Sequence, residues 1–488
     1  MNKPQRVHFI GICGVAMSAV ATALWQKGYR VTGSDSGFFS PVSTHLTNLG
    51  IPYYPGFHPE KMIVGDTRAR NGDFPGDNGG GAPDFVIVGN AIGTTNPELV
   101  YAREHNIPIK SYPEAVAEFI IAKNSIVCAG TWGKTTLTAL LTHILKRAGW
   151  KPSYMIGGVS ADGSPAAVID SREWSVVEGD EYMTAKWDQR AKFMHYKPTH
   201  LLISAVAWDH ADVYRTEKSY FKAFENLFAL VPKSTEPTGK MGFIVACADT
   251  EKLPALLARA KREYISYGKN NSAVYRYENV RQTRDGLLFD ITYHGKTYVI
   301  QSPLLGSYNA ENITGCFAMA REIGIAPGNI TDAIKEFHGI KRRLEKRYEN
   351  KVTIIDDIAH SPEKARSVLE TLRSIYSGKI IAVYEPNSGN RTPESKSQYE
   401  NAFRDADQVI IPRLSKLKID PKNPEKTFEG EALARMIAES HKNVQYIDND
   451  DELVKTVTEN RSEGDVIVFL GSHGWRGMIE ETIKKLVM

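Results

Sequence analysis

The chain of 488 residues is long enough for roughly three domains of about 150 residues each. Hydrophobic residues make up 42% and charged residues 24%, a composition that can bury several cores and excludes an extensively disordered protein. The net charge of +3 is close to balance, so no nucleic-acid partner is expected.

The cysteines and apolar stretches favour a cytoplasmic protein that does not bind membranes. Four cysteines lie far apart without a CxxC pair, which excludes a zinc ribbon or disulfide framework and fits a reducing compartment. Residues 3–26 have the outline of a secretory signal peptide. They fit a strand, a glycine turn and a helix better, because a second strand over residues 29–32 and the acidic Asp35 follow. No stretch approaches the ~20 apolar residues of a membrane helix.

Short apolar runs alternate with amphipathic helical segments along the whole chain, which predicts an α/β fold with parallel sheets. The buried strands are expected at residues 7–10, 29–32, 86–88, 125–129, 175–178, 201–205, 243–246, 351–355, 380–384 and 466–470. Residues 275–300 are predicted to be antiparallel, because Asp285-Gly286 and His294-Gly295 form turns there. We place the domains at residues 1–122, 123–338 and 339–488.

The first predicted strand leads into a glycine turn, residues 11–16 (GICGVA), and then a helix. Glycines at this place let backbone N–H groups approach a diphosphate at the helix N-terminus. The turn lacks the full GxGxxG spacing, so a tight turn without a ligand is a nearly equal alternative. Asp35, after the second strand, favours the nucleotide site because an acidic residue there commonly contacts a ribose or base.

A phosphate loop is predicted at residues 130–136 (GTWGKTT), between a strand and a helix. Backbone amides would surround the phosphates, Lys134 would neutralise β/γ charge, and the Thr135 hydroxyl could bind Mg²⁺. Cys128 occupies the first glycine position of the full GxxxxGK[ST] pattern. The strand–GKTT–helix order is nevertheless a specific signal.

Two polar turns follow later strands of the same region. Residues 178–181 (EGDE) are placed to hold Mg²⁺, with a solvated acidic turn as the alternative. Residues 209–212 (DHAD) suggest a second metal or a transition-state contact, with a structural histidine as the alternative.

The last third of the chain carries residues 342–345 (RRLE) and, after a strand, residues 356–362 (DDIAHSP). Two adjacent arginines usually lie on the surface without a specific partner. Arg342 and Arg343 could instead bind an anion if the C-terminal domain closed over the phosphate loop.

The order of these motifs, together with GxxNxxN at residues 306–312, resembles the Mur ligases over essentially the whole chain. The resemblance implies a Rossmann-like N-terminal domain, a central P-loop ATPase domain with a parallel sheet, and a C-terminal Rossmann-like α/β domain. It implies ATP and Mg²⁺ as cofactors, and a monomer or weak homodimer. The lactyl carboxylate of UDP-N-acetylmuramate would attack ATP to form an acyl phosphate, from which an amine then displaces phosphate.

The resemblance also implies roles for single residues. The catalytic residues would be Lys134, His210 and Arg343. The ATP-binding residues would be Gly130, Thr131, Gly133, Lys134, Thr135, Thr136, Asn309, Asn312, Arg343 and Asp357. The UDP-sugar would contact Gly11, Cys13, Gly14, Val15, Ala16, Asp35 and Asn90. Thr135, Glu178 and His210 would hold the metal.

Two branches of the family use UDP-N-acetylmuramate, one adding L-alanine and the other a recycled tripeptide. Residues 88–92 (VGNAI), 96–98 (NPE) and 188–196 (DQRAKFMHY) are more like the tripeptide branch, with Arg190 as the peptide-binding residue. That branch usually has other polar residues at four positions near the ATP site, which here are Trp132, Ala205, Ala207 and Tyr308. The L-alanine ligase and a catalytically impaired nucleotide-sugar-binding protein therefore stay open as alternatives.

Overall fold

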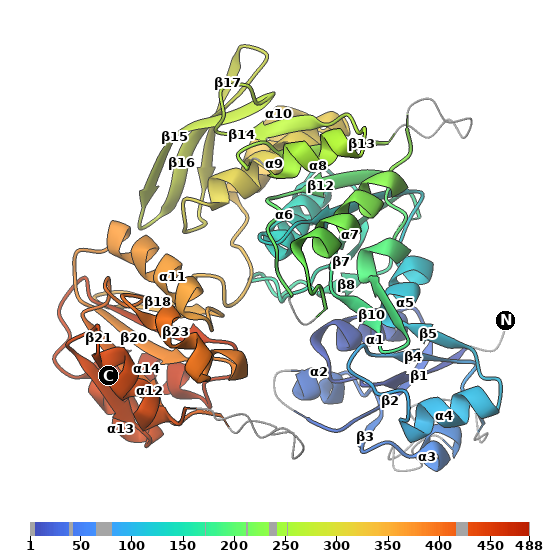
Figure 1. The fold of residues 1–488 in the computed structure, drawn as a ribbon, viewed down its shortest axis with the longest axis horizontal. Helices are drawn as coiled ribbons and strands as arrows, with labels where there is room; N and C mark the ends of the chain where they lie inside the picture. Colours follow the sequence, from blue (N-terminus) through green and yellow to red (C-terminus); the bar gives the residue numbers. More distant parts are fainter. Residues whose placement is uncertain are drawn as a thin grey trace. The chain divides into compact units, whose positions relative to one another are not determined.

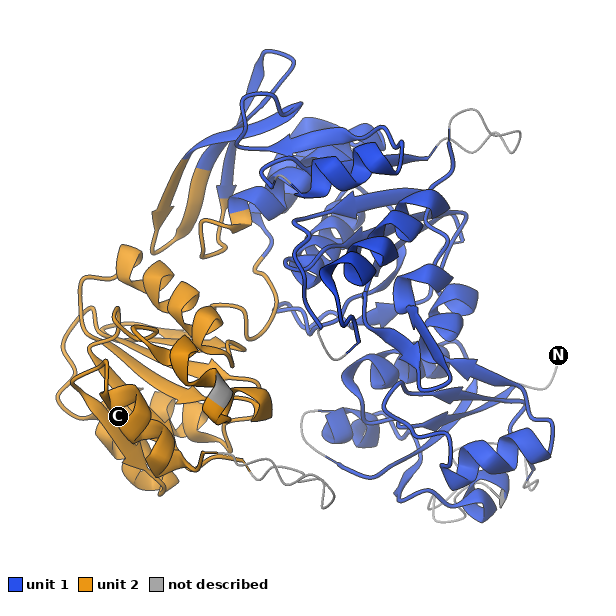
Figure 2. Ribbon diagram, in the orientation of Figure 1, with its two compact units in different colours: residues 1–279, 289–301, 310–337 blue, residues 280–288, 302–309, 338–488 orange. Residues whose placement is uncertain are grey.

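The computed structural model describes residues 5–38, 42–64, 81–170, 172–210, 213–233, 242–250, 252–415 and 428–487. The chain forms two compact units (Figure 2). Unit 1 comprises residues 1–279, 289–301 and 310–337, and unit 2 comprises residues 280–288, 302–309 and 338–488. Both units are α/β with largely parallel sheets, as the sequence predicts. The division into three domains stays a prediction.

The first sheet of unit 1 has five strands in the order β3-β2-β1-β4-β5 (Figure 1). All its neighbouring strands are parallel. The strands are β1 (Arg6–Ile10), β2 (Arg30–Asp35), β3 (Tyr53–Pro55), β4 (Phe85–Val88) and β5 (Ile109–Ser111). The helices are α1 (Val15–Gln26), α2 (Val42–Asn48), α3 (Pro59–Val64), α4 (Pro97–Glu104) and α5 (Tyr112–Phe119). Parallel pairing brings the residues that follow β1, β2 and β4 to one edge of the sheet.

The second sheet has ten strands in the order β17-β16-β15-β14-β13-β12-β6-β9-β7-β8. Its centre is parallel and contains β6 (Asn124–Ala129), β9 (Trp174–Glu178), β12 (His200–Ile203), β13 (Phe243–Cys247) and β14 (Ile265–Gly268). Short strands β7 (Ser153–Met155) and β8 (Ala167–Val168) extend one edge. At the other edge, β15 (Tyr275–Thr283), β16 (Gly286–Tyr293) and β17 (Lys296–Ser302) follow one another through short turns, which joins them antiparallel as predicted.

Helices and a small hairpin complete this part of the chain. The helices are α6 (Lys134–Arg147), α7 (Glu217–Leu230), α8 (Lys252–Arg259), α9 (Asn309–Glu322) and α10 (Pro327–Lys335). The hairpin pairs β10 (Met183–Ala185) with β11 (Asp188–Ala191), and the 3-10 turn η1 (Lys192–His195) follows. Of the helices described, none has the length and apolar character needed to cross a membrane.

Unit 2 contains a six-stranded sheet in the order β18-β19-β23-β20-β21-β22. Only β18 (Glu345–Glu349) is antiparallel to its neighbour; the parallel strands are β19 (Thr353–Asp357), β20 (Ile380–Glu385), β21 (Gln408–Pro412), β22 (Val444–Ile447) and β23 (Val466–Gly471). The helices are α11 (Pro362–Ile375), α12 (Gly430–Ala438), α13 (Asp450–Thr458) and α14 (Met478–Val487).

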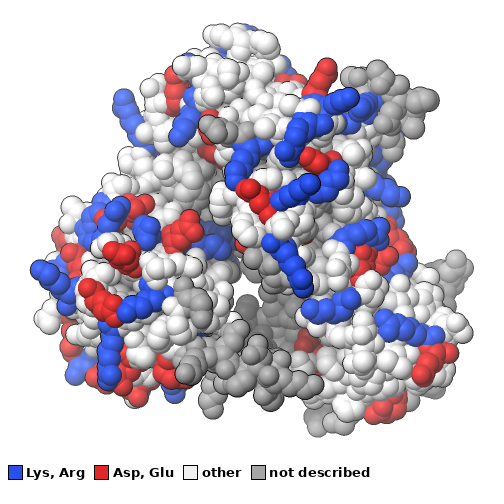
Figure 3. All heavy atoms as spheres, in the orientation of Figure 1, with Lys and Arg blue, Asp and Glu red and all other residues white. Residues whose placement is uncertain are grey.

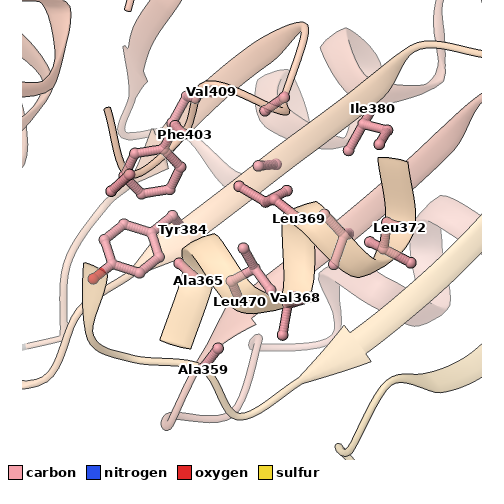
Figure 4. Packing of buried hydrophobic residues seen from close by; sticks show 14 of the residues in the cluster. Ala359, Ala365, Val368, Leu369, Leu372, Ile380, Tyr384, Phe403, Val409 and Leu470 are labelled. Atoms are coloured by element: carbon pink, nitrogen blue, oxygen red, sulfur yellow. The ribbon is translucent and has the colours of Figure 1, made fainter. Parts of the chain in front are cut away.

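Each face of this sheet has its own hydrophobic core. On one face, Leu369 and Leu372 of α11 pack against Ile380 and Tyr384 of β20 (Figure 4). On the other face, residues of α13 and α14 pack against Ile381 and Phe469. Removing a fully buried leucine such as Leu369 costs about 2–5 kcal/mol, so these cores hold the strand ends in place. Basic and acidic side chains are interspersed over the described parts of the surface in view (Figure 3).

Candidate functional site

The predicted phosphate loop lies between β6 and α6. Gly130 and Gly133 have φ angles of +129° and +79°, in the region where only glycine is free of strain. A Cβ at Gly133 would collide with Asn312 Oδ1, and a Cβ at Gly130 would collide with Ser204 Oγ. The loop therefore requires glycine at both positions for backbone and for packing reasons.

Thr131 anchors this loop to the segment that follows β12. Its backbone N–H donates to Ala205 O at 2.9 Å, and its hydroxyl donates to Ala207 O at 2.8 Å. The Ala207 N–H donates back to Thr131 Oγ1 at 2.9 Å. These hydrogen bonds use only backbone atoms of Ala205 and Ala207. The loop therefore keeps its anchor although alanine stands where the tripeptide branch usually has polar side chains.

Lys134, the first residue of α6, is paired with Glu181. Its Nζ lies 3.0 Å from Glu181 and donates to Gly130 O at 2.9 Å. The Lys134 side chain is 15% exposed and that of Glu181 is fully buried. Burial acts to lower the pKa of Lys134, but Glu181, Asp180 and Glu178 outweigh it and raise the pKa. A charged ammonium group is thus held at the loop.

Glu181 belongs to the predicted EGDE turn, but only Glu178 of that turn was assigned a role as a single residue. Besides Lys134, the Glu181 carboxylate lies 3.4 Å from His210 Nε2, and the Tyr220 hydroxyl donates to it at 3.5 Å. The pKa of His210 is raised, chiefly by the hydrogen bond to Glu181. Nothing in the sequence of the EGDE turn indicates that Glu181, and not one of its neighbours, pairs with Lys134 and His210. Of the predicted DHAD cluster, residues 211 and 212 lie outside the described residues.

The hydroxyl oxygen of Thr135, in the first turn of α6, lies next to the carboxylate of Glu178, the last residue of β9. The Thr135 hydroxyl donates to Glu178 Oε1 at 3.1 Å, and the Gly157 N–H donates to Oε2 at 2.9 Å. Burial raises the pKa of Glu178 above its usual range. A hydroxyl and a half-buried carboxylate are ligands that suit Mg²⁺, so this pair fits the predicted metal role.

Thr136 lies in the first turn of α6, and the two predicted asparagines lie in the first turn of α9. Asn312 is beside Gly133 of the phosphate loop. The Asn309 side chain donates to Leu305 O at 2.7 Å. The structure therefore brings Asn312 to the loop, while Asn309 fixes the entry into α9.

The glycine turn after β1 is held by contacts to β2. Gly11 has φ +90°, and its N–H donates to Ser34 O at 2.8 Å. The Cys13 N–H donates to Asp35 Oδ2 at 2.8 Å. Burial raises the pKa of the Cys13 thiol to about 11, which keeps the thiol neutral.

The turn brings the other predicted UDP-sugar residues to the same sheet edge. Gly14, Val15 and Ala16 begin α1, where amide groups have no acceptor within the helix. Asn90 is the second residue after β4, whose neighbour in the sheet is β1. One carboxylate oxygen of Asp35 accepts the hydrogen bond from the Cys13 N–H. Asp35 therefore joins the end of β2 to the glycine turn.

Arg190, the predicted peptide-binding residue, lies on β11. Its side chain is 66% exposed and makes a two-pronged ion pair with Asp188, with Nη2 2.7 Å from Oδ2. Lys192 contacts Asp180 at 2.5 Å, next to the Glu178–Glu181 turn. The hairpin therefore presents one exposed arginine from a fixed base.

Unit 2 separates the predicted arginine pair into two different environments. Arg342 donates to the carbonyls of Gly471, Ser472 and His473 and pairs with Asp356, so it is structural. Arg343 is exposed. Asp357 accepts from the Leu344 and Ala359 N–H groups at 2.7 and 2.8 Å, and burial raises its pKa to about 6.

Three family models match successive parts of the chain. They are described as "Mur ligase family, catalytic domain" at residues 6–124, "Mur ligase middle domain" at residues 128–320, and "Mur ligase, glutamate ligase domain" at residues 342–473.

Individual proteins with similar sequences come from two branches. The UDP-N-acetylmuramate--L-alanyl-gamma-D-glutamyl-meso-2,6-diaminoheptandioate ligase of Haemophilus influenzae is 31% identical over 83% of this chain and 85% of its own. The UDP-N-acetylmuramate--L-alanine ligase of Agrobacterium fabrum is 30% identical over 98% of this chain and 97% of its own. The crystal structure of the L-alanine ligase of Thermotoga maritima has the same fold, with a TM-score of 0.75, 23% identity and 98% of each chain covered. The chain thus belongs to the Mur ligase family, ATP-dependent enzymes that form amide bonds in peptidoglycan synthesis.

Proposed function

We propose that this Mur ligase joins UDP-N-acetylmuramate to the tripeptide L-alanyl-γ-D-glutamyl-meso-diaminopimelate. The observation that carries the proposal is the β10–β11 hairpin, which presents the exposed side chain of Arg190 in an ion pair with Asp188, while Lys192 joins the end of the hairpin to Asp180. A peptide with several carboxylates needs such an exposed cation, whereas free L-alanine needs only a small pocket. The tripeptide ligase of Haemophilus influenzae is 31% identical to this chain, against 30% for the L-alanine ligase of Agrobacterium fabrum, so the choice rests on the hairpin.

In the proposed reaction an oxygen of the substrate carboxylate forms a bond to the γ-phosphorus as the bond to ADP breaks. The amino nitrogen then bonds to the carbonyl carbon, phosphate leaves, and the amine loses a proton. Two anions meet in the first step, so charge neutralisation is the largest catalytic contribution expected. Lys134 supplies one fixed positive charge at the loop.

Thr135 and Glu178 are the residues proposed to hold Mg²⁺. A bound magnesium ion supplies further charge neutralisation between the phosphates and the substrate carboxylate. Strand β9 positions the carboxylate of Glu178, and the first turn of α6 positions the hydroxyl of Thr135.

A second candidate is the L-alanine ligase, because relatives with that name align over nearly the whole chain. The impaired-enzyme alternative has less support. The unusual Trp132 has a side chain that is 55% exposed. The contacts of Lys134 with Glu181 and of Thr135 with Glu178 are present in the same loop, so the substitution leaves them intact.

An ADP-release assay with UDP-N-acetylmuramate tests these alternatives with three amines: L-alanine, L-Ala-γ-D-Glu and the tripeptide. The tripeptide is expected to have the highest kcat/KM, and Lys134→Ala provides the background rate. If L-alanine is better by tenfold or more, about 1.4 kcal/mol in the transition state, the alanine ligase replaces our proposal. No amine-dependent ADP release with any of the three would indicate a binding protein.

A further inference from the structure

A fully buried carboxylate joins three neighbouring strands of the first sheet. Glu98 lies in the first turn of α4, and its side chain is 0% exposed. Its Oε2 accepts a hydrogen bond from the Ser34 hydroxyl at 2.5 Å and lies 3.4 Å from His8 Nε2. Its Oε1 accepts from the Tyr54 hydroxyl and from the His58 N–H, both at 2.7 Å. The contacts therefore come from β1, β2 and β3 and from the segment after β3.

These contacts keep the carboxylate in its charged form. Burial acts to raise the pKa of Glu98, but the hydrogen bonds from β1, β2 and β3 outweigh it and lower the pKa. The His8 ring is itself fixed, because its Nδ1 lies 2.8 Å from Thr32 Oγ1 and its face stacks on the Tyr54 ring. A hydrogen bond to a charged acceptor is roughly twice as strong as one to a neutral acceptor. Glu98 therefore holds its donors firmly, the Ser34 hydroxyl included.

Ser34 connects this carboxylate to the glycine turn at residues 11–16. While its hydroxyl donates to Glu98, its carbonyl oxygen accepts from the Gly11 N–H at 2.8 Å and from the Ile12 N–H at 3.1 Å. The turn also packs closely on β2, since a Cβ at Gly33 would collide with the Ile12 side chain. One serine thus holds the turn through its carbonyl and is itself held through its hydroxyl.

The orientation of the turn decides what its amide groups can bind. The turn continues directly into α1, and the amides that begin this helix have no acceptor within it. Such amides bind a diphosphate only when they point towards it together. A displaced turn would therefore lose affinity for a diphosphate. The phosphate loop between β6 and α6 belongs to the other sheet of unit 1, so its nucleotide should be unaffected.

We propose that Glu98 is a positioning residue for the UDP end of the sugar substrate, acting through the Ser34 hydroxyl on the glycine turn. The inference rests on the proposed use of UDP-N-acetylmuramate and is independent of the amine that is joined to it. The Tyr54 hydroxyl provides an internal contrast. It donates to the other oxygen of Glu98 and makes no hydrogen bond to the turn in the described part of the chain.

The first test measures binding of uridine diphosphate and of ADP to the full chain by titration calorimetry. Ser34→Ala removes the hydroxyl but keeps the carbonyl that accepts from the turn. It should raise the Kd for uridine diphosphate about tenfold, as expected for a lost hydrogen bond to a charged group, and leave the Kd for ADP within about twofold. Tyr54→Phe removes a donor from the same carboxylate, and it should raise the Kd for uridine diphosphate by less than about threefold.

The second test uses ADP release with the same variants. Ser34→Ala should raise KM for UDP-N-acetylmuramate, with KM for ATP and kcat little changed, because only the binding of one substrate depends on the turn. Ser175→Ala is the matched control, since it removes an equally buried hydroxyl from β9 of the second sheet. It should lower the thermal midpoint without changing either Kd.

Three results would overturn the proposal. One is an unchanged Kd for uridine diphosphate in Ser34→Ala. Another is an equal increase of this Kd in Ser34→Ala and Tyr54→Phe, which would show a purely structural network. If Ser34→Ala does not fold, Glu98→Gln replaces it, because glutamine offers one acceptor oxygen in place of two. An unchanged Kd for uridine diphosphate in that variant is the third.

The two proposals fail in different ways. A parent enzyme that shows the Ser34→Ala effect but prefers L-alanine refutes the proposed amine and keeps this inference. A parent enzyme that prefers the tripeptide, with a Kd for uridine diphosphate that Ser34→Ala leaves unchanged, keeps the proposed function and refutes the inference.

Discussion

Lys134 supplies the positive charge at the phosphate loop, where its Nζ donates to Gly130 O. Replacing it with Ala removes the ammonium that offsets phosphate charge, and kcat should fall at least ~100-fold. Steady-state ADP release measures this effect. Lys146→Ala, near the other end of α6, is the control and should leave kcat within a factor of two or so of the parent. An unchanged kcat in Lys134→Ala would remove the loop from the mechanism.

Glu178 should control magnesium affinity. Glu178→Gln keeps the size of the side chain but removes its charge. Its one amide oxygen can accept from Thr135 or from Gly157, not from both as the carboxylate does. We expect the apparent Mg²⁺ affinity to fall about tenfold or more, because a hard cation prefers a carboxylate ligand. Magnesium titrations of ADP release compare parent and variant. Superimposable curves would show that Glu178 only supports the turn.

His200 should make stability depend on pH. The ring is buried between Trp174 and Phe243, and burial lowers its pKa from 6.5 to about 4. Between these values the unfolded chain binds a proton that the folded chain does not. Stability should therefore fall as pH drops from 6.5 to 4, by up to about 1.4 kcal/mol per pH unit.

The measurement is the unfolding midpoint of the parent and His200→Gln at pH 7.5 and pH 5. The parent should lose more stability than the variant on acidification, and His105→Gln, at an exposed site, should behave like the parent. Equal pH slopes for the parent and His200→Gln would contradict the prediction.

At the scale of elements, the turn from β6 into α6 depends on a glycine that another helix covers. Gly133→Ala adds strain at φ +79° and a collision with Asn312 of α9. Gly149→Ala has a similar φ of +83° with nothing within 4 Å, so it isolates the backbone strain of about 1 kcal/mol. We expect Gly133→Ala to lower the thermal midpoint more and to weaken ATP binding. Equal effects of the two substitutions would show that α9 does not constrain the loop.

The elements that the sequence predicts best are the long apolar strands. Strands β6, β9, β13, β19, β20 and β23 lie where apolar runs predict them, because burial on both faces leaves a continuous hydrophobic signal. Strand β12 ends at Ile203, earlier than predicted, since Ser204 turns away to bond Trp132 O. The hairpin of β10 and β11 was missed because its strands have three and four residues and no apolar period.

At the scale of the whole molecule, Arg343 tests whether unit 2 contributes to catalysis. Arg343→Ala should lower kcat by about 10–100-fold if the side chain offsets phosphate charge, with little change in stability because the side chain is exposed. Arg342→Ala is the contrasting variant. It removes bonds to three carbonyls and to Asp356, so it should destabilise unit 2. A parent-like kcat in Arg343→Ala would remove Arg343 from the catalytic residues.

The sequence by itself determined the α/β class, the phosphate loop and the family, because apolar periodicity and motif spacing are local properties that survive without the fold. Only the tertiary structure decided which polar residues meet. Glu181 reaches Lys134 and His210 from a different strand end, Arg342 turns inward while Arg343 stays exposed, and Glu385 and Trp475 both border Gly471. Such meetings follow from strand order in the sheets, and a parallel sheet brings distant carboxyl ends to one edge in an order that local sequence does not encode.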